Sequence, residues 1–169
     1  CKPNCIKNIL EVGTNLGVSG QYFIKALENK KNTKFVTLEG VKGLCEMASA
    51  RFNRLTSQNR FEVVHGLYDK TLPSVLKSRI RFDLVFIDGN HQYEATLKYF
   101  ELVKNNLTDG ALVIFDDIHW SKGMRKAWEE IGVQKEIAFS INFFKLGIIV
   151  FDPKQTKPTD DHHQLFLSM

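Results

Sequence analysis

The sequence predicts a doubly wound α/β domain whose mostly parallel, seven-stranded sheet ends in an antiparallel strand pair. Short runs rich in β-branched and aromatic residues alternate along the chain with segments of helical periodicity. This alternation is typical of parallel strands joined by crossover helices. Near the end of the chain, however, two apolar runs (residues 136–144 and 146–151) are separated by one residue. So short a connection indicates antiparallel pairing.

The first half of the chain supplies three strand–helix units. We expect strands at residues 6–12, 34–39 and 61–65, and helices at 18–28, 41–55 and 70–77. The second helix has the clearest pattern, because its apolar residues (positions 41, 44, 45, 48, 52 and 55) fall on one face. Cys45 belongs to that face and is expected in the core.

The second half supplies two central strands, two helices and the final pair. The runs FDLVFID (82–88) and ALVIFDD (111–117) are almost wholly apolar before their acidic ends, as expected for strands covered on both faces. Helices are expected at 93–107 and 124–131, with a turn at Asp109-Gly110 before the fifth strand. The antiparallel ending distinguishes this order from a dinucleotide-binding Rossmann domain, which would continue with parallel strands.

Length and composition indicate one globular domain, since 169 residues can bury a sizeable core. We expect the domain to span residues 1–152 and residues 153–169, with two prolines, to form a loosely ordered tail. No apolar run approaches the roughly 20 residues of a membrane span, and no signal peptide is recognisable, so we expect a cytoplasmic protein with no membrane partner. The net charge is +4, but the basic residues are scattered, which disfavours nucleic-acid binding.

Polar residues, many of them acidic, follow the end of every predicted parallel strand. In an open parallel sheet, ligands bind beyond these carboxyl ends, near the point where the strand order reverses. The segments there are, in chain order, Glu11-Val12-Gly13, Glu39-Gly40, His65-Gly66, Asp88-Gly89-Asn90-His91 and Asp116-Asp117-Ile118-His119. The sequence therefore predicts a functional site along this edge.

The first loop and the end of the second strand suggest an adenosine ligand. Gly13 and Gly17 would let backbone N–H groups approach a ligand closely, although an ordinary strand–helix turn also fits this G-x-x-x-G spacing. Glu39 stands 22 residues after Gly17, where a carboxylate can accept both hydroxyls of a ribose. Alternatively, Glu39 is a charge favoured by the N-terminus of the next helix.

Three strings resemble, in order, motifs of class I S-adenosylmethionine-dependent methyltransferases. They are EVGTNLG (11–17), TLEG (37–40) and FIDGNH (86–91). The strings DGNHQYE (88–94) and FDDIHW (115–120) are similar to a bacterial O-methyltransferase-like subfamily. The resemblance covers roughly residues 6–151. It implies a Rossmann-like methyltransferase fold and a transferase that uses S-adenosylmethionine.

The resemblance also implies a role for each matching position. Gly13, Thr14 and Gly17 would line the methionine part of the cofactor, with Glu11 nearby; Glu39 would hold the ribose; Gly40 would pass close to the adenosine; His65, Gly66 and Leu67 would border the adenine; and Asp88 would lie beside the sulfonium. Methyl transfer needs alignment of the acceptor and removal of its proton, so the remaining candidates concern proton removal.

Two ways of activating an acceptor hydroxyl are visible. Asp88, Asp116 and Asp117 would bind Mg²⁺ or another divalent cation as oxygen ligands. Metal-dependent O-methyltransferases often have Asp-Asn at the second position, whereas this chain has Asp-Asp, and the two carboxylates could merely cap a turn. Alternatively, His91 acts as general base unless it is an ordinary surface residue, with His119 as a second candidate for base or outer metal ligand.

Tyr93 and Trp120 could offer an aromatic wall to a substrate or simply pack on the sheet, and His162 and His163 fall in the tail. The leading hypothesis is O-methylation of a small hydroxyl-bearing acceptor. An alternative is a cofactor-binding module without transfer activity in a longer protein. A nicotinamide oxidoreductase is disfavoured by the glycine spacing. The sequence leaves the oligomeric state open, with a dimer as one option.

Overall fold

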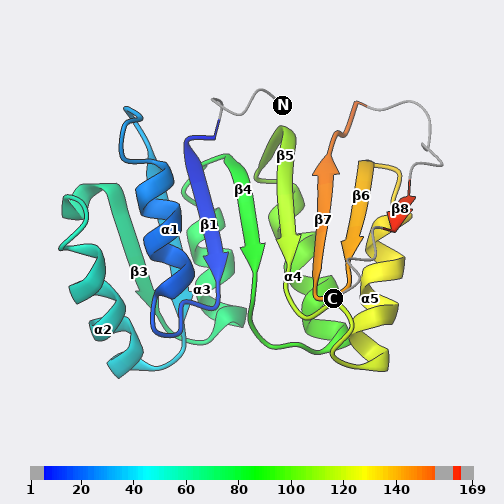
Figure 1. Ribbon diagram of the computed structural model, residues 1–169, viewed down its shortest axis with the longest axis horizontal. Coiled ribbons are helices and arrows are strands. Elements are labelled where there is room, and N and C mark those ends of the chain that lie inside the picture. Colours follow the sequence, from blue (N-terminus) through cyan, green and yellow to red (C-terminus); the bar gives the residue numbers. More distant parts are fainter. Residues whose placement is uncertain (1–5, 155–161, 165–169) are drawn as a thin grey trace.

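The computed structural model of this protein describes residues 6–154 and 162–164. It consists of a single mixed sheet with helices on both faces (Figure 1). The strands are β1 (Asn8–Val12), β2 (Lys34–Glu39), β3 (Phe61–His65), β4 (Phe82–Ile87), β5 (Leu107–Phe115), β6 (Ile137–Phe143), β7 (Leu146–Phe151) and β8 (His162–Gln164). The helices are α1 (Val18–Ala26), α2 (Lys42–Phe52), α3 (Tyr68–Leu76), α4 (Tyr93–Lys104) and α5 (Lys122–Gly132), with a 3₁₀ turn η2 (Gln58–Arg60).

The strand order, β3-β2-β1-β4-β5-β7-β6-β8, is that of a doubly wound sheet. Strands β1 to β5 are parallel to one another, and β7 runs antiparallel to both β5 and β6. The chain builds outward from β1 to β3 and then returns to the other side of β1 through β4. This reversal places the carboxyl ends of β1 and β4 side by side at the lower edge in Figure 1. The predicted fold class is confirmed.

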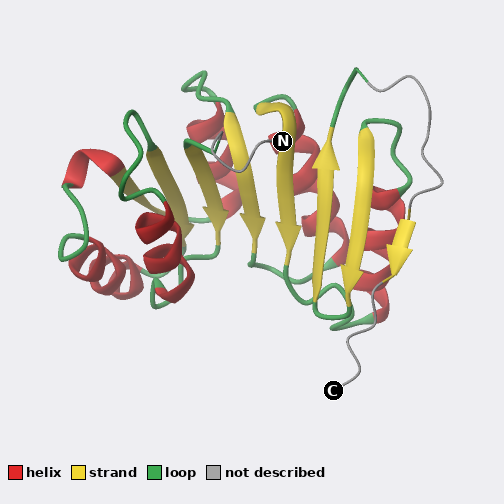
Figure 2. Cartoon of the chain, turned by 45° about the horizontal axis from the view of Figure 1, so that its top comes forward, coloured by secondary structure: helices red, strands yellow, loops and turns green. Residues whose placement is uncertain are grey.

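Two apolar clusters hold the helices to the sheet. Helices α1 and α2 pack on one face through residues such as Ile24 and Phe52, while α3, α4 and α5 pack on the other through residues such as Leu72, Phe100 and Trp128. Figure 2 shows the two helical layers on either side of the sheet. Cys45 is 8% exposed, so its predicted core position is confirmed.

The structure differs from the sequence prediction at the fifth strand and in the tail. Asp109 and Gly110 lie inside β5, where Gly110 has a φ of +77° and the register with β4 shifts, instead of forming a turn before the strand. In the predicted tail, residues 162–164 form β8, which pairs in parallel with β6. An edge strand has unpaired backbone groups that can pair with a segment of almost any sequence. A polar segment can therefore join the sheet there without the alternating apolar pattern from which strands are predicted. The prediction for residues 155–161 and 165–169 lies outside the described residues.

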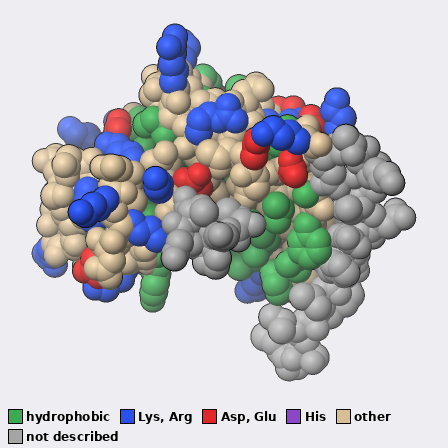
Figure 3. Space-filling model, turned by 90° about the horizontal axis from the view of Figure 1, so that it is seen from above, with side chains coloured by type: hydrophobic (Ala, Val, Ile, Leu, Met, Phe, Trp, Pro, Cys, Tyr) green, Lys and Arg blue, Asp and Glu red, His purple; other side chains and the backbone are tan. Residues whose placement is uncertain are grey.

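Figure 3 views the molecule from the edge at which the parallel strands begin, and it shows how the charged side chains of the described residues are distributed there. In Figure 3 the Lys and Arg side chains are spread over that face among other residue types, as the sequence predicts. Within residues 6–154 and 162–164, no helix combines the length and the apolar character that a bilayer crossing requires.

Candidate functional site

Gly13 is the point at which three strand ends meet. Its φ is +110°, and a Cβ added there would lie 2.0 Å from the carbonyl oxygen of Asp88. The backbone amides of Gly13 and Thr14 both donate to the carbonyl oxygen of Leu38, at 3.1 Å, and the amide of Asp88 donates to that of Val12 at 2.8 Å. Only glycine fits this combination of backbone angle and close approach. The loop after β1 is therefore held against β2 and β4 without an intervening side chain.

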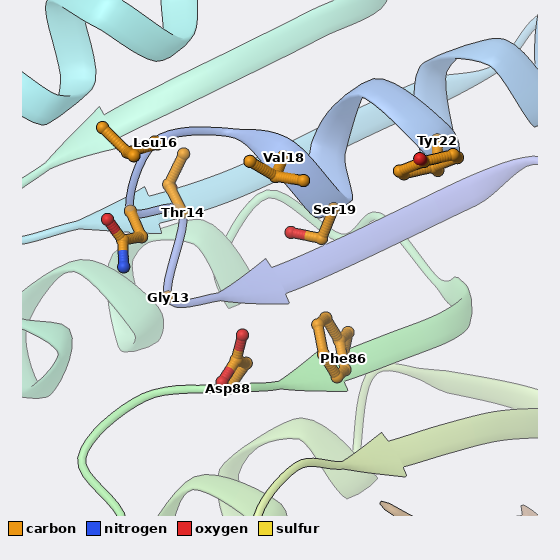
Figure 4. A pocket seen from close by; sticks show the side chains of 9 residues that line it. Gly13, Thr14, Leu16, Val18, Ser19, Tyr22, Phe86 and Asp88 are labelled. Carbon is orange, nitrogen blue, oxygen red and sulfur yellow. The ribbon is translucent and has the colours of Figure 1, made fainter.

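A cavity of about 370 Å³ opens beside this glycine. It is lined by Gly13, Thr14, Asn15, Leu16, Val18, Ser19, Tyr22, Phe86 and Asp88. Figure 4 shows Phe86 and Asp88 on one side and the residues of the loop and of α1 on the other. Asp88 is the charged member of this lining, so the cavity offers a ligand a glycine-rich backbone, an aromatic wall and one carboxylate.

The carboxyl group of Glu11 lies fully buried beneath this cavity. Ser19 Oγ donates to Glu11 Oε1, and Thr37 Oγ1 donates to Glu11 Oε2 at 2.6 Å. Thr14 Oγ1 lies 2.5 Å from Thr37 Oγ1. Burial raises the pKa of Glu11 to about 7, against the opposing effect of the hydrogen bonds from Ser19 and Thr37. Through Ser19 and Thr14 the Glu11 carboxyl group is thus connected to the cavity wall.

Replacing Glu11 by glutamine is expected to flatten the dependence of stability on pH. A raised folded-state pKa means that the folded protein binds the proton more tightly than the unfolded chain. The contribution of Glu11 is thus fully present below pH 4.5 and is lost as pH rises through about 7; this loss amounts to about 3 kcal/mol at most. Urea unfolding at pH 5 and pH 8 measures it.

In the same unfolding experiment, Glu129→Gln serves as the control, because Glu129 is an exposed side chain on α5. Its pH dependence is expected to match that of the parent protein. An equally steep loss of stability between pH 5 and pH 8 in Glu11→Gln would contradict the assignment.

Glu39 joins the loop after β1 to the start of α2. Its side chain is 6% exposed; Oε2 accepts from the backbone amide of Asn15 at 2.8 Å and Oε1 from that of Val41 at 2.9 Å. The carboxylate lies next to the cavity, through Asn15, but is not part of its lining. Each carboxylate oxygen can accept a second hydrogen bond, so the group is both fixed in position and able to accept from a ligand.

Four further positions, all assigned to the cofactor from the sequence, differ in their surroundings: Gly17, Gly40, Gly66 and Leu67. Gly17 starts α1 with a φ of +73°, and a Cβ there would meet Ala48 and Phe52 at 3.0 Å, so its role is close packing of α1 on α2. Gly66 also has a positive φ, +141°. Gly40 has open space around it, and Leu67 is 67% exposed. Neither Gly17, Gly40, Gly66 nor Leu67 lines the cavity beside Gly13.

Asp88 is the centre of an acidic cluster at the ends of β4 and β5. Burial raises the pKa of Asp88 to about 7. The charge of Asp116, a hydrogen bond that protonated Asp88 donates to Asp116, and the charges of Glu11 and Asp117 all act in the same direction. His91 Nε2 lies 3.7 Å from Asp88 Oδ1, which is a charge contact rather than a hydrogen bond. The structure therefore brings His91 and Asp88 together.

The predicted metal ligands converge only in part. Asp88 and Asp116 interact directly, and the charge of Asp117 also acts on Asp88. The backbone of Asp117 is left-handed, with a φ of +52°. In the part of the chain that the structure describes, no three His, Cys, Asp or Glu side chains are grouped so as to hold an ion. His119 instead contacts the β6–β7 hairpin, at 3.0 Å from Asn142. The donor set as it stands does not form the predicted three-carboxylate site.

Tyr68 belongs to this region, although the sequence prediction missed it. Its ring packs edge-on against Tyr99, and a Cβ at Gly89 would lie 2.8 Å from it. Burial raises the pKa of Tyr68 to about 12, and the charges of Glu39 and Asp88 contribute. Nothing in its sequence context marks Tyr68 except that it follows the segment Gly66-Leu67.

The two aromatic wall candidates behave differently. The Tyr93 hydroxyl donates to Glu130 at 2.8 Å, and Lys126 Nζ lies 4.6 Å from the centre of the Tyr93 ring. Tyr93, at the start of α4, therefore contacts α5. The Trp120 side chain, by contrast, is 73% exposed. Of these two residues, Trp120 is the one that remains available to a ligand.

Known proteins resemble this chain both in sequence and in fold. Uncharacterized protein R132 of Acanthamoeba polyphaga mimivirus is 27% identical over 135 residues, which represent 72% of this chain and 58% of that protein. This chain thus spans less than two thirds of the length of that relative. An O-methyltransferase from Bacillus cereus, solved in complex with SAH, superposes with a TM-score of 0.74 at 23% identity, covering 88% of this chain and 76% of that one.

The O-methyltransferase TomG from Streptomyces achromogenes, solved in complex with SAM, gives a TM-score of 0.75 at 22% identity, covering 88% of this chain and 74% of TomG. At these identities the structural likeness establishes the fold. Family membership rests on a separate match, since the family model described as "Methyltransferase domain" covers residues 10–118. This stretch includes the last three residues of β1, all of β2 to β5 and all the acidic strand ends described above. The chain therefore belongs to the methyltransferase domain family.

Proposed function

We propose that this domain binds S-adenosylmethionine and transfers its methyl group to a hydroxyl of a small acceptor. The observation that carries the proposal is the cradle at Gly13, where no Cβ can fit and where the Asp88 carboxylate faces the cavity. A carboxylate beside a close-approach glycine suits a ligand with a cationic centre. The proposal is further supported by the methyltransferase family match and by the SAH and SAM bound to the structural neighbours.

In this proposal the residues of the site have different roles in binding and in catalysis. The backbone from Gly13 to Ser19 and the Glu39 carboxylate hold the cofactor, which when bound supplies an electrophilic methyl group. His91 accepts the proton of the acceptor hydroxyl as the oxygen takes the methyl group. Asp88, whose Oδ1 is 3.7 Å from His91 Nε2, stabilises the positive charge that His91 then carries.

We also expect turnover to persist without a divalent cation. The described carboxylates do not form a three-ligand cluster, so the proposed mechanism assigns no step to a metal. Exhaustive dialysis against a chelator, followed by the transfer assay, tests this expectation, with a mock-dialysed sample as control. Activity that disappears on chelation and returns with Mg²⁺ would instead favour the site predicted from Asp88, Asp116 and Asp117.

Two measurements test the proposed function itself. Calorimetry should show binding of S-adenosylmethionine and none of NAD, and incubation with labelled cofactor should methylate at least one member of a panel of hydroxylated metabolites. Binding without any transfer would favour the alternative hypothesis of a cofactor-binding module. Binding of NAD in place of S-adenosylmethionine would overturn the proposal.

A further inference from the structure

A second cavity, of about 190 Å³, lies on the same edge of the sheet as the Gly13 cavity. It is lined by Asp117, His119, Trp120, Phe144 and Lys145. The first three residues belong to the loop after β5 and the last two to the turn between β6 and β7. The backbone amide of Ile118 donates to the carbonyl oxygen of Lys145 at 3.0 Å. This hydrogen bond holds the two walls of the cavity together.

One wall of this second cavity is aromatic. The rings of His119 and Phe144 are stacked, with centroids 5.2 Å apart and planes 16° from parallel. His119 Nε2 lies 3.0 Å from Asn142 Nδ2, which fixes the ring orientation. The indole of Trp120 is 73% exposed beside them. Flat, apolar faces of this kind bind planar rings by stacking.

Phe144 adopts a backbone conformation that its residue type disfavours. Its φ is +69°, a left-handed value at which hairpin turns normally use glycine or asparagine. A bulky residue held in this region costs on the order of 1 kcal/mol or more. The turn therefore gives up some stability to place an aromatic ring on His119, and such strain is often found at binding sites.

The two ends of the second cavity carry opposite charges. Asp117 directly follows Asp116, whose backbone amide donates to the carbonyl oxygen of Ile87 at 3.0 Å, so Asp117 lies next to the end of β4 that carries Asp88. Lys145, across the cavity in the hairpin turn, is exposed and forms no ion pair with any residue in the described part of the chain. A ligand in this cavity would thus meet carboxylates on the side of Asp88 and a free cation on the other side.

We propose that this second cavity is the acceptor subsite and that it takes a planar ring compound with a hydroxyl at one end and an anionic group at the other. The ring stacks on Trp120 and on the His119–Phe144 pair, the anionic group pairs with Lys145, and the hydroxyl points toward Asp88 and His91. This assignment rests on the proposed function, since it supplies that reaction with its acceptor class.

Three probe compounds test this subsite by calorimetry in the presence of SAH. They are 3,4-dihydroxybenzoate, the neutral 3,4-dihydroxybenzyl alcohol, and quinate, which has a carboxylate but no planar ring. The benzoate is expected to bind about two- to fivefold more tightly than the alcohol, as for one exposed charge pair. Quinate is expected to bind at least about tenfold more weakly than the benzoate, because it cannot stack.

Substitution of Lys145 by methionine should remove the preference for the benzoate over the alcohol. It should leave the Kd of the alcohol and the Kd of SAH unchanged, since the backbone carbonyl that binds Ile118 is retained. The matched control is Lys31→Met, an exposed lysine in the turn before β2 at the opposite edge of the sheet. It should keep the full preference.

Each result supports or overturns the subsite, independently of the proposed function. Equal affinities for benzoate and alcohol, a preference that survives in Lys145→Met, or no binding of any probe overturns the subsite. In all three cases S-adenosylmethionine binding and transfer to other acceptors would leave the proposed function standing. Conversely, a Lys145-dependent preference in a protein that does not bind S-adenosylmethionine would support the binding site and refute the methyl-transfer function.

Discussion

Gly13→Ala is expected to abolish S-adenosylmethionine binding and to lower the free energy of unfolding by about 3 kcal/mol or more. The added Cβ would lie 2.0 Å from the carbonyl oxygen of Asp88, so β1 and β4 would have to separate at their carboxyl ends. The φ of +110° is also strained for alanine. Urea unfolding measures the loss of stability and calorimetry the loss of cofactor affinity.

A second glycine provides the matched control for this substitution. Gly43 lies in α2, and a Cβ added there would have no neighbour within 4 Å. Gly43→Ala is therefore expected to retain cofactor affinity and to gain up to about 1 kcal/mol of stability from helix propensity. If Gly13→Ala binds the cofactor as tightly as the parent protein, the Gly13 loop is not the cofactor site.

Asp88→Asn is expected to lower the rate of methyl transfer by about 10²- to 10⁴-fold while changing cofactor affinity far less. The amide keeps the size of the side chain but removes the negative charge beside His91. For the same reason, turnover of the parent protein should fall as the pH drops below about 7, where Asp88 becomes protonated. Single-turnover rates and cofactor Kd, measured across pH, separate the two effects.

The control for this change is Asp69→Asn, at an exposed aspartate in the first turn of α3 that pairs with Lys98. Its turnover and pH profile should match those of the parent protein. Full turnover in Asp88→Asn would rule out a role in transfer. A loss of cofactor affinity as large as the loss of turnover would assign Asp88 to binding instead.

The sequence was sufficient to predict the fold because each element carries its own local signal. Apolar runs at 82–88 and 111–117 and the helical stripe from 41 to 55 each depend on residues close in the chain. The errors arose where pairing depends on distant backbone. Asp109-Gly110 resembles a turn, but β5 continues through it as an irregularity between the pairs Phe82–Leu107 and Leu84–Leu112. Strand β8 forms because β6 offers an open edge.

The candidate site was predicted only as far as topology allows. Parallel strands bring their carboxyl ends to one edge, so Gly13, Glu39 and Asp88 could be grouped from sequence. The partners of Glu11 were not predictable in this way, because Thr37 reaches it through the register of β1 with β2. Likewise, Tyr68 and the second cavity depend on side-chain packing between segments that are far apart in sequence.

The turn at Phe144 has a practical consequence for engineering this domain. A stability-guided redesign would exchange Phe144 for glycine or asparagine first, since its backbone conformation favours those residues. Such a variant should have a higher melting temperature and yet discriminate less well among acceptors, a trade-off between stability and activity that is common at functional sites. Thermostabilising libraries for this protein should therefore leave position 144 fixed and place their substitutions on the far edge of the sheet.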